Sequence, residues 1–520
     1  MNLASILEKS AKNHPFKRSV ISGKSKISYA QLNLLANQLA SFFIKHKNLK
    51  KQSKIAILHE NSINYLVALF AIAKAGMISV PLNTFLKPSA FIYILNGCEV
   101  ELLISSSKFQ DSLGELKKRT DSLRDIVITD EKIESFLYLE DILDKECKNN
   151  LNEVTDETEV ALISYTSSTT GSPKGVMLSH KNIVSNINSC LKAIEVKSKD
   201  CFLMLLPMFH SFTLTASVFL PIKAGARLII LQSMKPVRRI IKTVIFNRIT
   251  ILVGIPQLFR ILNYIKLPKI YSILSFLNPL RLAISGAAPL DKKIANKFME
   301  KYKIKLLEGY GLAEASPVVS INPVDKDSRL GSVGLPLPGI EAKVIDVEES
   351  ELPPNEVGEL IVRGPNVMKG YYNMPYETAE AIKGGWLFTG DLAKIDKDGY
   401  IYIVDRKKDL IISHGMNIYP REIEEVIELH PKVKEVAVIG KKDKHKGEVP
   451  IAIIVTEENA TIESKEIIEH CKDRLANYKV PHIIEIKKEL PKTPTGKVLK
   501  RKLREEYKSI SNENYQRRTS

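Results

Sequence analysis

The sequence has few cysteines and a single tryptophan. Its five cysteines are scattered over 520 residues, are odd in number and include no Cys-x-x-Cys pair. Neither a disulfide framework nor a zinc site is therefore expected, and a reducing compartment is favoured. Residues 1–20 carry charges throughout and lack the apolar core of a signal sequence. These features predict a cytoplasmic protein.

Long apolar runs are also absent. The most apolar stretch, residues 203–224, contains Pro207, His210, Ser211 and Pro221, so a buried element fits it better than a membrane span. Charge is abundant instead, and the formal net charge of +17 suits a polyanionic ligand, an acidic membrane surface or nucleic acid without choosing among them. Because no lysine-rich run is interleaved with aromatic residues, a nucleic-acid partner is not favoured.

Strand-like and helix-like segments alternate through the first two thirds of the chain. Residues 54–60 resemble a strand, residues 62–76 a buried helix closed by Gly76, and residues 77–83 a second strand. This alternation predicts α/β layers with largely parallel sheets. From about Gly331, short strands separated by glycine and proline indicate a small, mostly antiparallel β unit.

The composition changes again after Val404, where amphipathic helices with interspersed strands begin. We therefore expect an α/β protein with a large multi-lobed N-terminal domain over residues 1–405, in which parallel α/β sheets are joined by a β-barrel-like unit. A small, mobile α+β domain is expected over residues 406–510. Residues 511–520 are expected to form a polar tail.

A loop rich in hydroxyl groups is the first candidate site. Residues 165–175 (YTSSTTGSPKG) follow an expected strand and precede a helix that begins near Ser179. The hydroxyl groups, glycines and Lys174 suit contacts with phosphate oxygens, although a polar surface turn explains such a cluster equally well. The loop is not a Walker P-loop, because no glycine lies five residues before a Gly-Lys-Ser/Thr sequence.

The same segment resembles the phosphate loop of the adenylate-forming superfamily, which includes acyl-CoA synthetases, luciferases and the adenylation domains of peptide synthetases. Each further motif alone is explained as a turn, a helix start, a surface ion pair or a basic tail. Together they run in the superfamily's order over roughly residues 160–500, and the chain is identified as a member. The further motifs are residues 285–289 (SGAAP), 308–314 (EGYGLAE), 389–391 (TGD), 405–409 (DRKKD) and 491–497 (PKTPTGK).

The resemblance implies ATP and Mg²⁺ as ligands and assigns roles to the motif residues. It makes Lys497 the catalytic adenylation lysine, and it places Mg²⁺ at Glu314 and Thr166. It also implies that Asp391 and Arg406 contact the ribose and that Lys408 is the pivot of the mobile domain. The remaining nucleotide-binding candidates are Thr166, Ser167, Ser168, Thr169, Thr170, Gly171 and Lys174 in the phosphate loop, and Gly286, Ala287, Ala288, Glu308, Gly309, Tyr310 and Gly311 near adenine.

Two positions in these motifs carry further expectations. The superfamily usually has Thr or Ser before the magnesium-binding glutamate, whereas this chain has Ala313. A hydroxyl that can touch phosphate is thereby lost, so either the phosphate loop compensates or the α-phosphate is held less tightly. In the 285–289 turn, small residues let a flat base approach the backbone, and Pro289 is expected to open the next helix.

The acid is indicated by residues 207–225 and 367–408. Amino-acid-activating relatives place an acidic residue in the first region to pair with the substrate ammonium, and this chain has none there; a buried unpaired ammonium is costly. The second region resembles the signature of fatty acyl-CoA synthetases, so a fatty acid is expected. His210 is either a gate beside the substrate carboxylate or a packed core histidine. Trp386 is expected to be a core aromatic.

Coenzyme A is the expected acceptor. Residues 413–417 resemble the segment that lines the pantetheine tunnel, where Gly415 leaves room for a thin thioalkyl arm, and coenzyme A also suits the positive charge. Acyl carrier protein, as in a fatty-acyl-AMP ligase or acyl-acyl-carrier-protein synthetase, remains an alternative acceptor. A luciferase-like oxygenase and a non-catalytic membrane or nucleic-acid binder are alternatives of other classes.

The wider partners are less specified. Residues 266–281 mix basic and apolar side chains, which would suit a peripheral membrane contact, although a buried helix or loop is favoured because the stretch is short and contains two prolines. The chain is expected to be a monomer or a homodimer.

Overall fold

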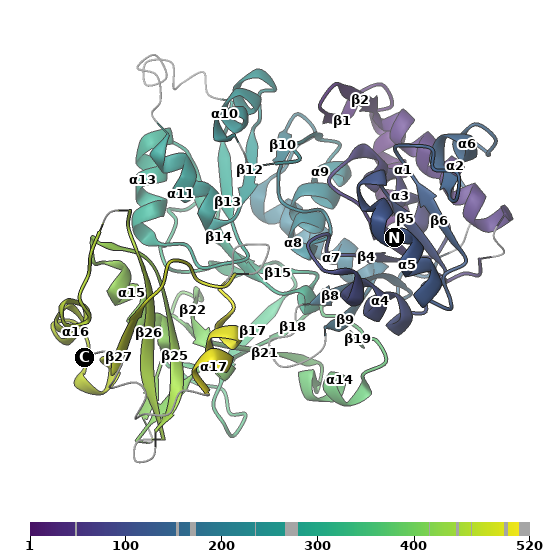
Figure 1. The fold of residues 1–520 in the computed structure, drawn as a ribbon. Coiled ribbons are helices and arrows are strands. Elements are labelled where there is room, and N and C mark those ends of the chain that lie inside the picture. The colour runs from purple at the N-terminus through teal and green to yellow at the C-terminus, as the bar shows by residue number, and fades with distance from the viewer. Residues whose placement is uncertain are drawn as a thin grey trace. The chain divides into compact units, whose positions relative to one another are not determined.

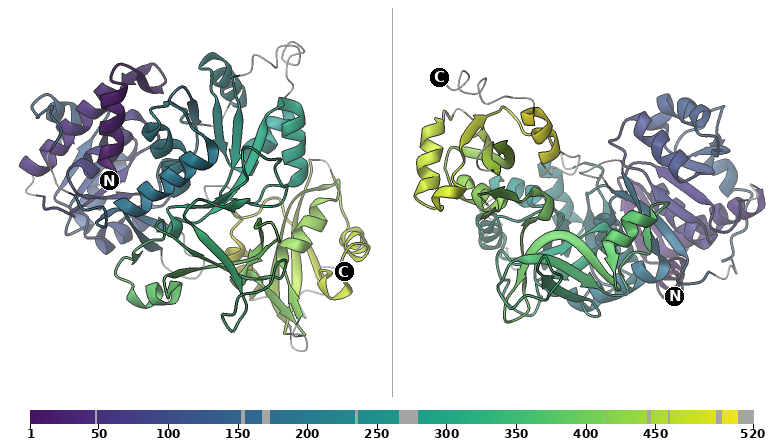
Figure 2. Two further views of the ribbon diagram at one scale, coloured as in Figure 1. Left: turned by 180° about the vertical axis from the view of Figure 1, so that it is seen from behind. Right: turned by 90° about the horizontal axis from the view of Figure 1, so that it is seen from below.

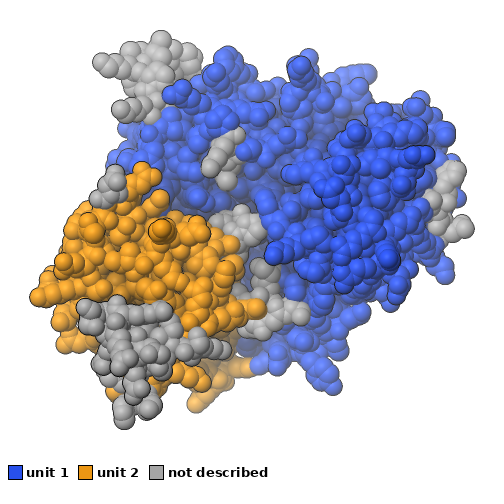
Figure 3. Space-filling model, viewed as in Figure 1, with its two compact units in different colours: residues 1–168, 172–342, 362–388 blue, residues 169–171, 343–361, 389–520 orange. Residues whose placement is uncertain are grey.

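A computed structural model describes residues 1–46, 49–151, 155–166, 173–233, 236–265, 279–414, 416–443, 447–458, 460–492 and 498–508. The chain divides into two compact units (Figure 3). Unit 1 comprises residues 1–168, 172–342 and 362–388, and unit 2 comprises residues 169–171, 343–361 and 389–520. The expected division at residues 405 and 406 stays a prediction, since unit 2 also contains residues 343–361 and 389–405.

An eight-stranded sheet in unit 1 has the order β19-β9-β8-β4-β3-β5-β6-β7 (Figure 1). The strands from β8 to β7 are parallel, and β9 is antiparallel to both β8 and β19. This sheet confirms the expected parallel α/β layer. Its strands are β3 (Lys54–Leu58), β4 (Ile78–Pro81), β5 (Leu102–Ser105), β6 (Asp125–Ile128), β7 (Leu137–Tyr138), β8 (Val160–Thr166), β9 (Lys174–Ser179) and β19 (Gly370–Tyr371).

A nine-stranded sheet in unit 1 has the order β16-β15-β14-β13-β12-β10-β11-β1-β2. The strands from β14 to β1 are parallel, and the pairs at the two edges are antiparallel. Its strands are β1 (Arg18–Ser22), β2 (Ser25–Ser28), β10 (Cys201–Met204), β11 (Arg227–Ile230), β12 (Ile251–Gly254), β13 (Leu282–Ser285), β14 (Lys305–Gly311), β15 (Val318–Ile321) and β16 (Leu335–Pro336).

The helices of unit 1 alternate with these strands along the chain (Figure 1). The capping signals that the sequence carries fix where several of them begin. Those with five or more described residues are α1 (Ala4–Asn13), α2 (Tyr29–His46), α3 (Ile63–Lys74), α4 (Pro88–Gly97), α5 (Gln110–Arg119), α6 (Leu139–Leu143), α7 (His180–Ile194), α10 (Val237–Phe246), α11 (Pro256–Tyr264), α13 (Lys292–Tyr302) and α14 (Pro375–Ala381).

Helix α3 shows how the sequence sets these bounds. The Ser62 side chain accepts a hydrogen bond from the Tyr65 backbone N–H and caps the start of the helix. Every side chain from Tyr65 to Lys74 is buried, as the nearly unbroken apolar run predicts. The helix ends before Gly76, whose φ of +65° takes the chain into the turn to β4.

A five-stranded sheet has the order β17-β18-β21-β20, with β22 also paired to β21. Strand β21 is antiparallel to both β20 and β22, as expected for the β unit. Trp386, at the start of β21, is only partly buried, and its ring lies 4.6 Å from the Arg363 guanidinium. The expectation of a core aromatic there is wrong. The strands are β17 (Glu341–Ile345), β18 (Gly358–Arg363), β20 (Ile382–Lys383), β21 (Trp386–Ile395) and β22 (Ile401–Arg406).

The C-terminal part of unit 2 is built on a second five-stranded sheet, with β25 and β26 as its long strands. Val436 and Val438 face a core shared with α15 and α16, whereas Ala437 and Ile439 face a core shared with α17. Helices therefore cover both faces of the sheet (Figure 1 and Figure 2), which confirms the expected α+β character. The elements are β23 (Ile411–Ser413), β24 (Met416–Ile418), α15 (Pro420–Glu428), β25 (Val433–Asp443), β26 (Gly447–Thr456), α16 (Ser464–Lys472), β27 (Ile483–Ile486) and α17 (Lys500–Lys508).

Across the described residues, no helix combines the length and the apolar character needed to cross a membrane.

Candidate active site

The expected phosphate loop connects the two strands of a hairpin. Thr166 at the end of β8 pairs with Lys174 at the start of β9, and the Thr166 hydroxyl makes only a long 3.5 Å contact with the Lys174 carbonyl oxygen. Helix α7, which follows the hairpin, begins at the Ser179 cap as expected. Strand β9, which lies between the loop and this helix, was not predicted from the sequence. The candidates Ser167, Ser168, Thr169, Thr170 and Gly171 lie outside the described residues.

Glu314 lies in a short 3₁₀ segment (Ala313–Ala315) and accepts a hydrogen bond from a residue that sequence reasoning missed. The Tyr371 hydroxyl donates to Oε1 of Glu314 at 2.9 Å. Burial, reinforced by the Glu314 carboxylate, raises the pKa of Tyr371, so the phenol stays protonated and remains a donor. The Tyr371 ring also lies 4.8 Å from the Lys174 ammonium. Tyr371 therefore contacts both the expected metal ligand and the lysine of the phosphate loop.

Buried side chains hold the backbone on the C-terminal side of Glu314. The Asn366 amide donates to the Ala315 carbonyl oxygen at 2.7 Å, and the Ser316 hydroxyl donates to the Asn366 carbonyl oxygen at 2.7 Å. The Thr215 hydroxyl donates to the Ser316 carbonyl oxygen at 3.1 Å. Since Thr215 belongs to the stretch expected to shape the acid pocket, the Glu314 segment and that stretch are directly connected.

The residues around Glu314 fit Mg²⁺ bound together with phosphate, rather than a metal enclosed by protein ligands. Within the described ranges, no group of three or more His, Cys, Asp or Glu side chains is arranged to hold a metal ion. Magnesium is commonly bound through one or two carboxylates together with substrate phosphates and water. A single half-buried carboxylate on Glu314, whose Oε1 is held by Tyr371, meets that requirement.

The expected adenine turn follows β13. A Cβ atom on Gly286 would lie only 2.8 Å from Cζ of Phe212, so the aromatic ring packs directly on the glycine backbone. Ala287 has a φ of +66°, and Ala288 is partly buried. Helix α13 begins only at Lys292, where Asp291 provides the cap, so the expectation that Pro289 opens the helix is wrong.

The EGYG motif forms the end of β14, next to this turn. Glu308 is buried and its Oε1 accepts a hydrogen bond from the Leu290 backbone N–H at 3.0 Å. Its carboxylate therefore holds the turn that follows Ala288. Gly309 and Tyr310 pair with β15 of the same sheet, and Gly311 ends the strand. The turn and the motif are thus brought together on neighbouring parallel strands.

The apolar stretch after β10 is helical and contains an irregular turn. Helix α8 (Ser211–Thr213) continues into a π-helix (Leu214–Phe219) and then into α9 (Leu220–Lys223). All six residues of the π-helix are buried, which confirms that the stretch is a buried element. Such π-helical turns are uncommon and often occur at functional sites.

His210 caps the start of this helical stretch. Its Nδ1 accepts a hydrogen bond from the Phe212 backbone N–H at 3.3 Å, and its side chain is only partly buried. The alternative of a packed core histidine is therefore wrong, and the role of a gate beside the substrate carboxylate stays a prediction.

In unit 2, Asp391 and Arg406 face each other on adjacent strands. They are register partners on β21 and β22, and the Arg406 Nε lies 3.3 Å from Oδ1 of Asp391. The Asp391 side chain is only 10% exposed, whereas that of Arg406 is 38% exposed. The neighbouring Thr389 hydroxyl accepts from the Asp391 backbone N–H at 3.1 Å and donates to the Leu360 carbonyl oxygen at 2.7 Å. The TGD motif is therefore held firmly before any ligand binds.

The expected pivot follows immediately. Lys408 lies in a 3₁₀ segment (Lys407–Asp409), where desolvation and the Arg406 guanidinium lower its pKa to about 8. The preceding Asp405 is buried and its carboxylate accepts from the Arg421 backbone N–H at 2.8 Å in the first turn of α15. The end of β22 is thereby attached to the first helix of the C-terminal part.

The two remaining candidates, Lys497 and Gly415, lie outside the described residues, but the chain on either side of each is defined. Lys492 and Val498, the described residues on either side of 493–497, form an antiparallel bridge. Ser413 and Met416 are register partners at the tip of the β23–β24 hairpin that contains Gly415. The described residues on either side of each candidate are therefore paired with each other.

Comparisons with known proteins agree with this arrangement. Residues 7–372 match the AMP-binding enzyme family, and residues 422–497 match the AMP-binding enzyme C-terminal domain. The chain belongs to the AMP-binding enzyme family.

Individual relatives are similar over nearly the whole chain. A long-chain-fatty-acid–CoA ligase from Escherichia coli O6:H1 is 32% identical over 97% of this chain and 94% of its own length. A long-chain-fatty-acid–CoA ligase from Bacillus subtilis is 33% identical, with the same shares covered. The crystal structure of ATP-bound MatB from Rhodopseudomonas palustris has a TM-score of 0.90 and 31% identity over 98% of this chain and 100% of its own.

Proposed function

We propose that this protein is an ATP-dependent ligase that joins a fatty acid to coenzyme A through an acyl-adenylate. The observation that carries the proposal is the set of contacts at Glu314, where Tyr371 and Lys174 bring a carboxylate, a phenol and an ammonium to the family's phosphate loop. The curated relatives named as long-chain-fatty-acid–CoA ligases support the same reaction. A long acyl chain is the favoured substrate.

The buried stretch from α8 to α9 supports an acid with an apolar tail. It contains no Asp or Glu between Pro207 and Gly225, and its π-helical residues are all buried. An amino acid's ammonium placed against it would lose hydration without gaining a counter-charge. An alkyl chain loses no hydrogen bonds there and gains from burial.

In the first half-reaction, a carboxylate oxygen of the fatty acid attacks the α-phosphorus of ATP, and the bond from that phosphorus to the bridging oxygen breaks to release pyrophosphate. We assign Lys497 to stabilise the charge that develops during this attack. Asp391 accepts hydrogen bonds from the ribose hydroxyls, and Thr166 with Lys174 contacts phosphate oxygens. Glu314 and Thr166 would hold Mg²⁺, which offsets phosphate charge when bound.

In the second half-reaction, the thiol of coenzyme A loses its proton and attacks the acyl carbonyl carbon. The bond between that carbon and the adenylate oxygen breaks, and AMP leaves with the oxygen. We assign the segment around Gly415 to the passage of the thioalkyl arm. Rotation of the C-terminal domain about Lys408 would exchange Lys497 for Gly415 at the site between the two steps.

The reaction is tested by coupled AMP release with acids of increasing chain length, each with and without coenzyme A. We expect AMP release that depends on ATP and a fatty acid, rises toward long chains and is stimulated by free coenzyme A. Rates with amino acids that equal those with fatty acids would contradict the proposed acid. Stimulation by acyl carrier protein but not by coenzyme A would instead identify a fatty-acyl-AMP ligase.

We also propose that helix α10 brings the enzyme to an anionic phospholipid surface, where free fatty acids partition. Ile240 is buried on the inner face of α10, while Ile245 and Phe246 are 47% and 80% exposed. The exposed cations Arg238, Arg239 and Lys242 share this helix, and none forms an ion pair with any described residue. Exposed apolar side chains beside exposed cations are typical of a membrane-surface helix.

Sedimentation with phosphatidylglycerol vesicles tests this contact. Replacing Ile245 and Phe246 by serine should reduce vesicle binding several-fold without changing the rate on a short-chain acid in solution. Tyr376→Ser, which removes an aromatic side chain that is 84% exposed on α14, is the matched control and should bind like the wild type. Equal binding by all three proteins would contradict the assignment. Residues 266–281, whose composition would also suit a membrane contact, lie largely outside the described residues.

A further inference from the structure

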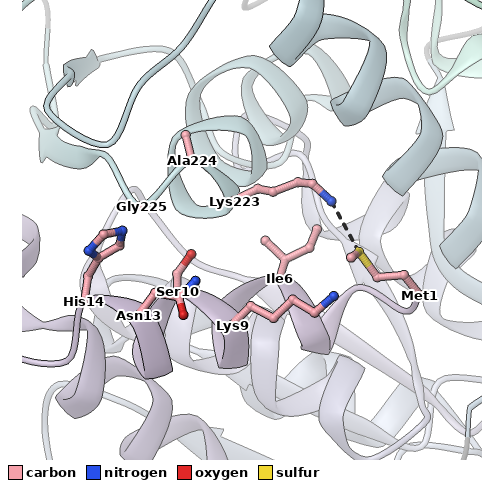
Figure 4. Close-up of a pocket in the computed structure, with 9 residues that line it drawn as sticks. All are labelled: Met1, Ile6, Lys9, Ser10, Asn13, His14, Lys223, Ala224 and Gly225. Carbon is pink, nitrogen blue, oxygen red and sulfur yellow. Dashed lines mark hydrogen bonds between the residues drawn. The ribbon is translucent and has the colours of Figure 1, made fainter.

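A second candidate ligand site lies in unit 1, where α1 faces the turn between α9 and β11 (Figure 4). The cavity there has a volume of about 230 Å³ and is open to solvent. Lys9 and Asn13 on α1 line one side, and Lys223 at the end of α9 lines the other. Lys9 and Asn13 belong to no motif assigned to ATP, the acid or coenzyme A, and Lys223 lies at the C-terminal end of the stretch assigned to the acid.

The charges that line this cavity are all of one sign. The side chains of Lys9 and Lys223 extend from opposite walls toward Met1, with Ile6 between them (Figure 4). His14 lies at the other end, and no Asp or Glu is among the described residues that line the cavity. The nearby acidic side chains are engaged elsewhere, since Glu8 binds Lys74 and Glu157 binds the N-terminal amino group at 2.8 Å.

Lys223 lacks a good acceptor in this cavity. Its ammonium contacts the Met1 sulfur at 3.2 Å, and it has no other hydrogen-bond partner in the part of the chain that the structure describes. A thioether sulfur is a weak acceptor. Burial and the Lys9 charge lower the pKa of Lys223. An anion in the cavity would therefore relieve both the missing hydrogen bonds and the repulsion between the two ammonium groups.

The walls of the cavity are firmly connected. The Ser10 hydroxyl donates to the Ile222 carbonyl oxygen at 2.6 Å, and the Lys17 ammonium donates to the Gly225 carbonyl oxygen at 2.6 Å. Gly225 has a φ of +66°, and a Cβ there would lie 2.4 Å from Cδ2 of His14. The histidine ring therefore packs on the glycine backbone and closes that end. A preorganised wall of this kind costs little ordering on binding.

We propose that this cavity is a binding site for a small, soluble phosphate-bearing anion, held between Lys9 and Lys223. Two ammonium groups match a dianionic phosphate better than a fatty acid's single carboxylate, and the small volume suits a phosphate group with few further atoms. Asn13, whose side chain makes no hydrogen bond to a described residue, supplies a further donor. A bound anion would bridge α1 and α9, and so would stabilise the C-terminal end of the helical stretch that begins at α8.

Calorimetric titration of the full chain with inorganic phosphate, at constant ionic strength set with chloride, tests the site. Lys223→Gln and, separately, the more exposed Lys9→Gln should each weaken phosphate binding by about tenfold, the size expected for one charge-assisted hydrogen bond. The Lys9→Gln variant, which changes no residue of the stretch assigned to the acid, should keep the wild-type rate of AMP release. Lys12→Gln, which changes an exposed lysine of α1 outside the cavity, is the matched control and should bind phosphate normally.

Two further arms separate the alternatives. Asp391→Ala, which alters the proposed nucleotide site, should leave this phosphate binding unchanged, whereas its loss would place the phosphate in the nucleotide site and overturn the proposal. Vesicles containing phosphatidic acid should not compete with inorganic phosphate. Binding to such vesicles that depends on Lys9 and Lys223, without binding of soluble phosphate, would overturn the assignment to a soluble ligand. Wild-type phosphate affinity in both lysine variants would also contradict it.

Discussion

The Tyr371 hydroxyl donates a hydrogen bond of 2.9 Å to Oε1 of Glu314, although the two residues are 57 positions apart in the sequence. Strand β19 makes this contact, because its pairing with β9 fixes Tyr371 opposite Val176. The same tyrosine ring lies 4.8 Å from the Lys174 ammonium. The Tyr371 side chain therefore contacts both the Glu314 carboxylate and the Lys174 ammonium near the phosphate loop.

Tyr371→Phe should therefore weaken the Glu314 site while preserving the ring and its contact with Lys174. A hydrogen bond to a charged acceptor contributes about 1.5–3 kcal/mol, so we expect kcat/KM for adenylation to fall roughly tenfold or more. A positioning role predicts that the apparent affinity for Mg²⁺ falls as well. The measurement is pyrophosphate release titrated with Mg²⁺.

Tyr372→Phe is the control for this prediction, because Tyr372 is the next residue, is also partly buried and has its ring 5.6 Å from the Lys54 ammonium. It should leave the Mg²⁺ titration unchanged. An unaltered Mg²⁺ dependence in Tyr371→Phe would show that the hydrogen bond has no part in adenylation.

Asp391→Asn should impair nucleotide binding without unfolding the β unit. The amide keeps the shape of the side chain but loses the charge that accepts from ribose hydroxyls and faces Arg406. A loss of about 2 kcal/mol corresponds to a roughly thirtyfold rise in the KM for ATP. Steady-state kinetics at varied ATP measures it. Asp398→Asn, in the exposed turn after β21, should behave like the wild type, and equal KM values in all three proteins would show that the ribose is bound elsewhere.

Lys497→Ala should affect only the first half-reaction. Lys497 follows two prolines near the end of the chain, where a lysine is ordinarily a solvated surface residue. Its proposed role requires it to reach the substrate carboxylate and the α-phosphate. Removing one preorganised donor costs on the order of a hundredfold in rate, so acyl-adenylate formation should fall by at least that factor. Thioester formation from preformed acyl-adenylate should continue near the wild-type rate. A parallel loss of both half-reactions would contradict domain rotation, and no loss would make Lys497 a surface residue.

The stability of unit 1 should fall in acid because of His180. This side chain is fully buried at the start of α7, its Nδ1 accepts from the Leu3 backbone N–H at 3.0 Å, and desolvation lowers its pKa to about 4. His180 therefore binds a proton near pH 6.5 in the unfolded chain but only near pH 4 in the folded chain. This difference removes about 3 kcal/mol of stability between about pH 6.5 and pH 4.

Urea unfolding of wild type and His180→Asn across this pH range measures the effect. The variant should lose this component of the pH dependence, since the amide oxygen still accepts from Leu3 but does not titrate. His482→Asn, at an exposed position, should keep the wild-type slope. An unchanged slope in His180→Asn would show that His180 is protonated in the folded state.

The sequence predicted the alternating layers and the order of the motifs better than it predicted contacts. Local signals were sufficient for α3, where a cap, an apolar run and a glycine agree. They failed for Tyr371, because only strand pairing brings it to Glu314. They also failed for Trp386, where a surface arginine covers the ring in place of a core. The prediction that Pro289 opens the next helix failed because Asp291, two residues later, caps helix α13.

The central claim is that the carboxylate is activated as an acyl-adenylate. Incubating the enzyme with ATP, coenzyme A and a long-chain fatty acid labelled with ¹⁸O in its carboxylate tests it most directly. Because the acid's oxygen bonds to the α-phosphorus and then leaves with AMP, mass spectrometry should find one ¹⁸O atom in each AMP formed. Unlabelled AMP, produced together with acyl-CoA, would contradict the account.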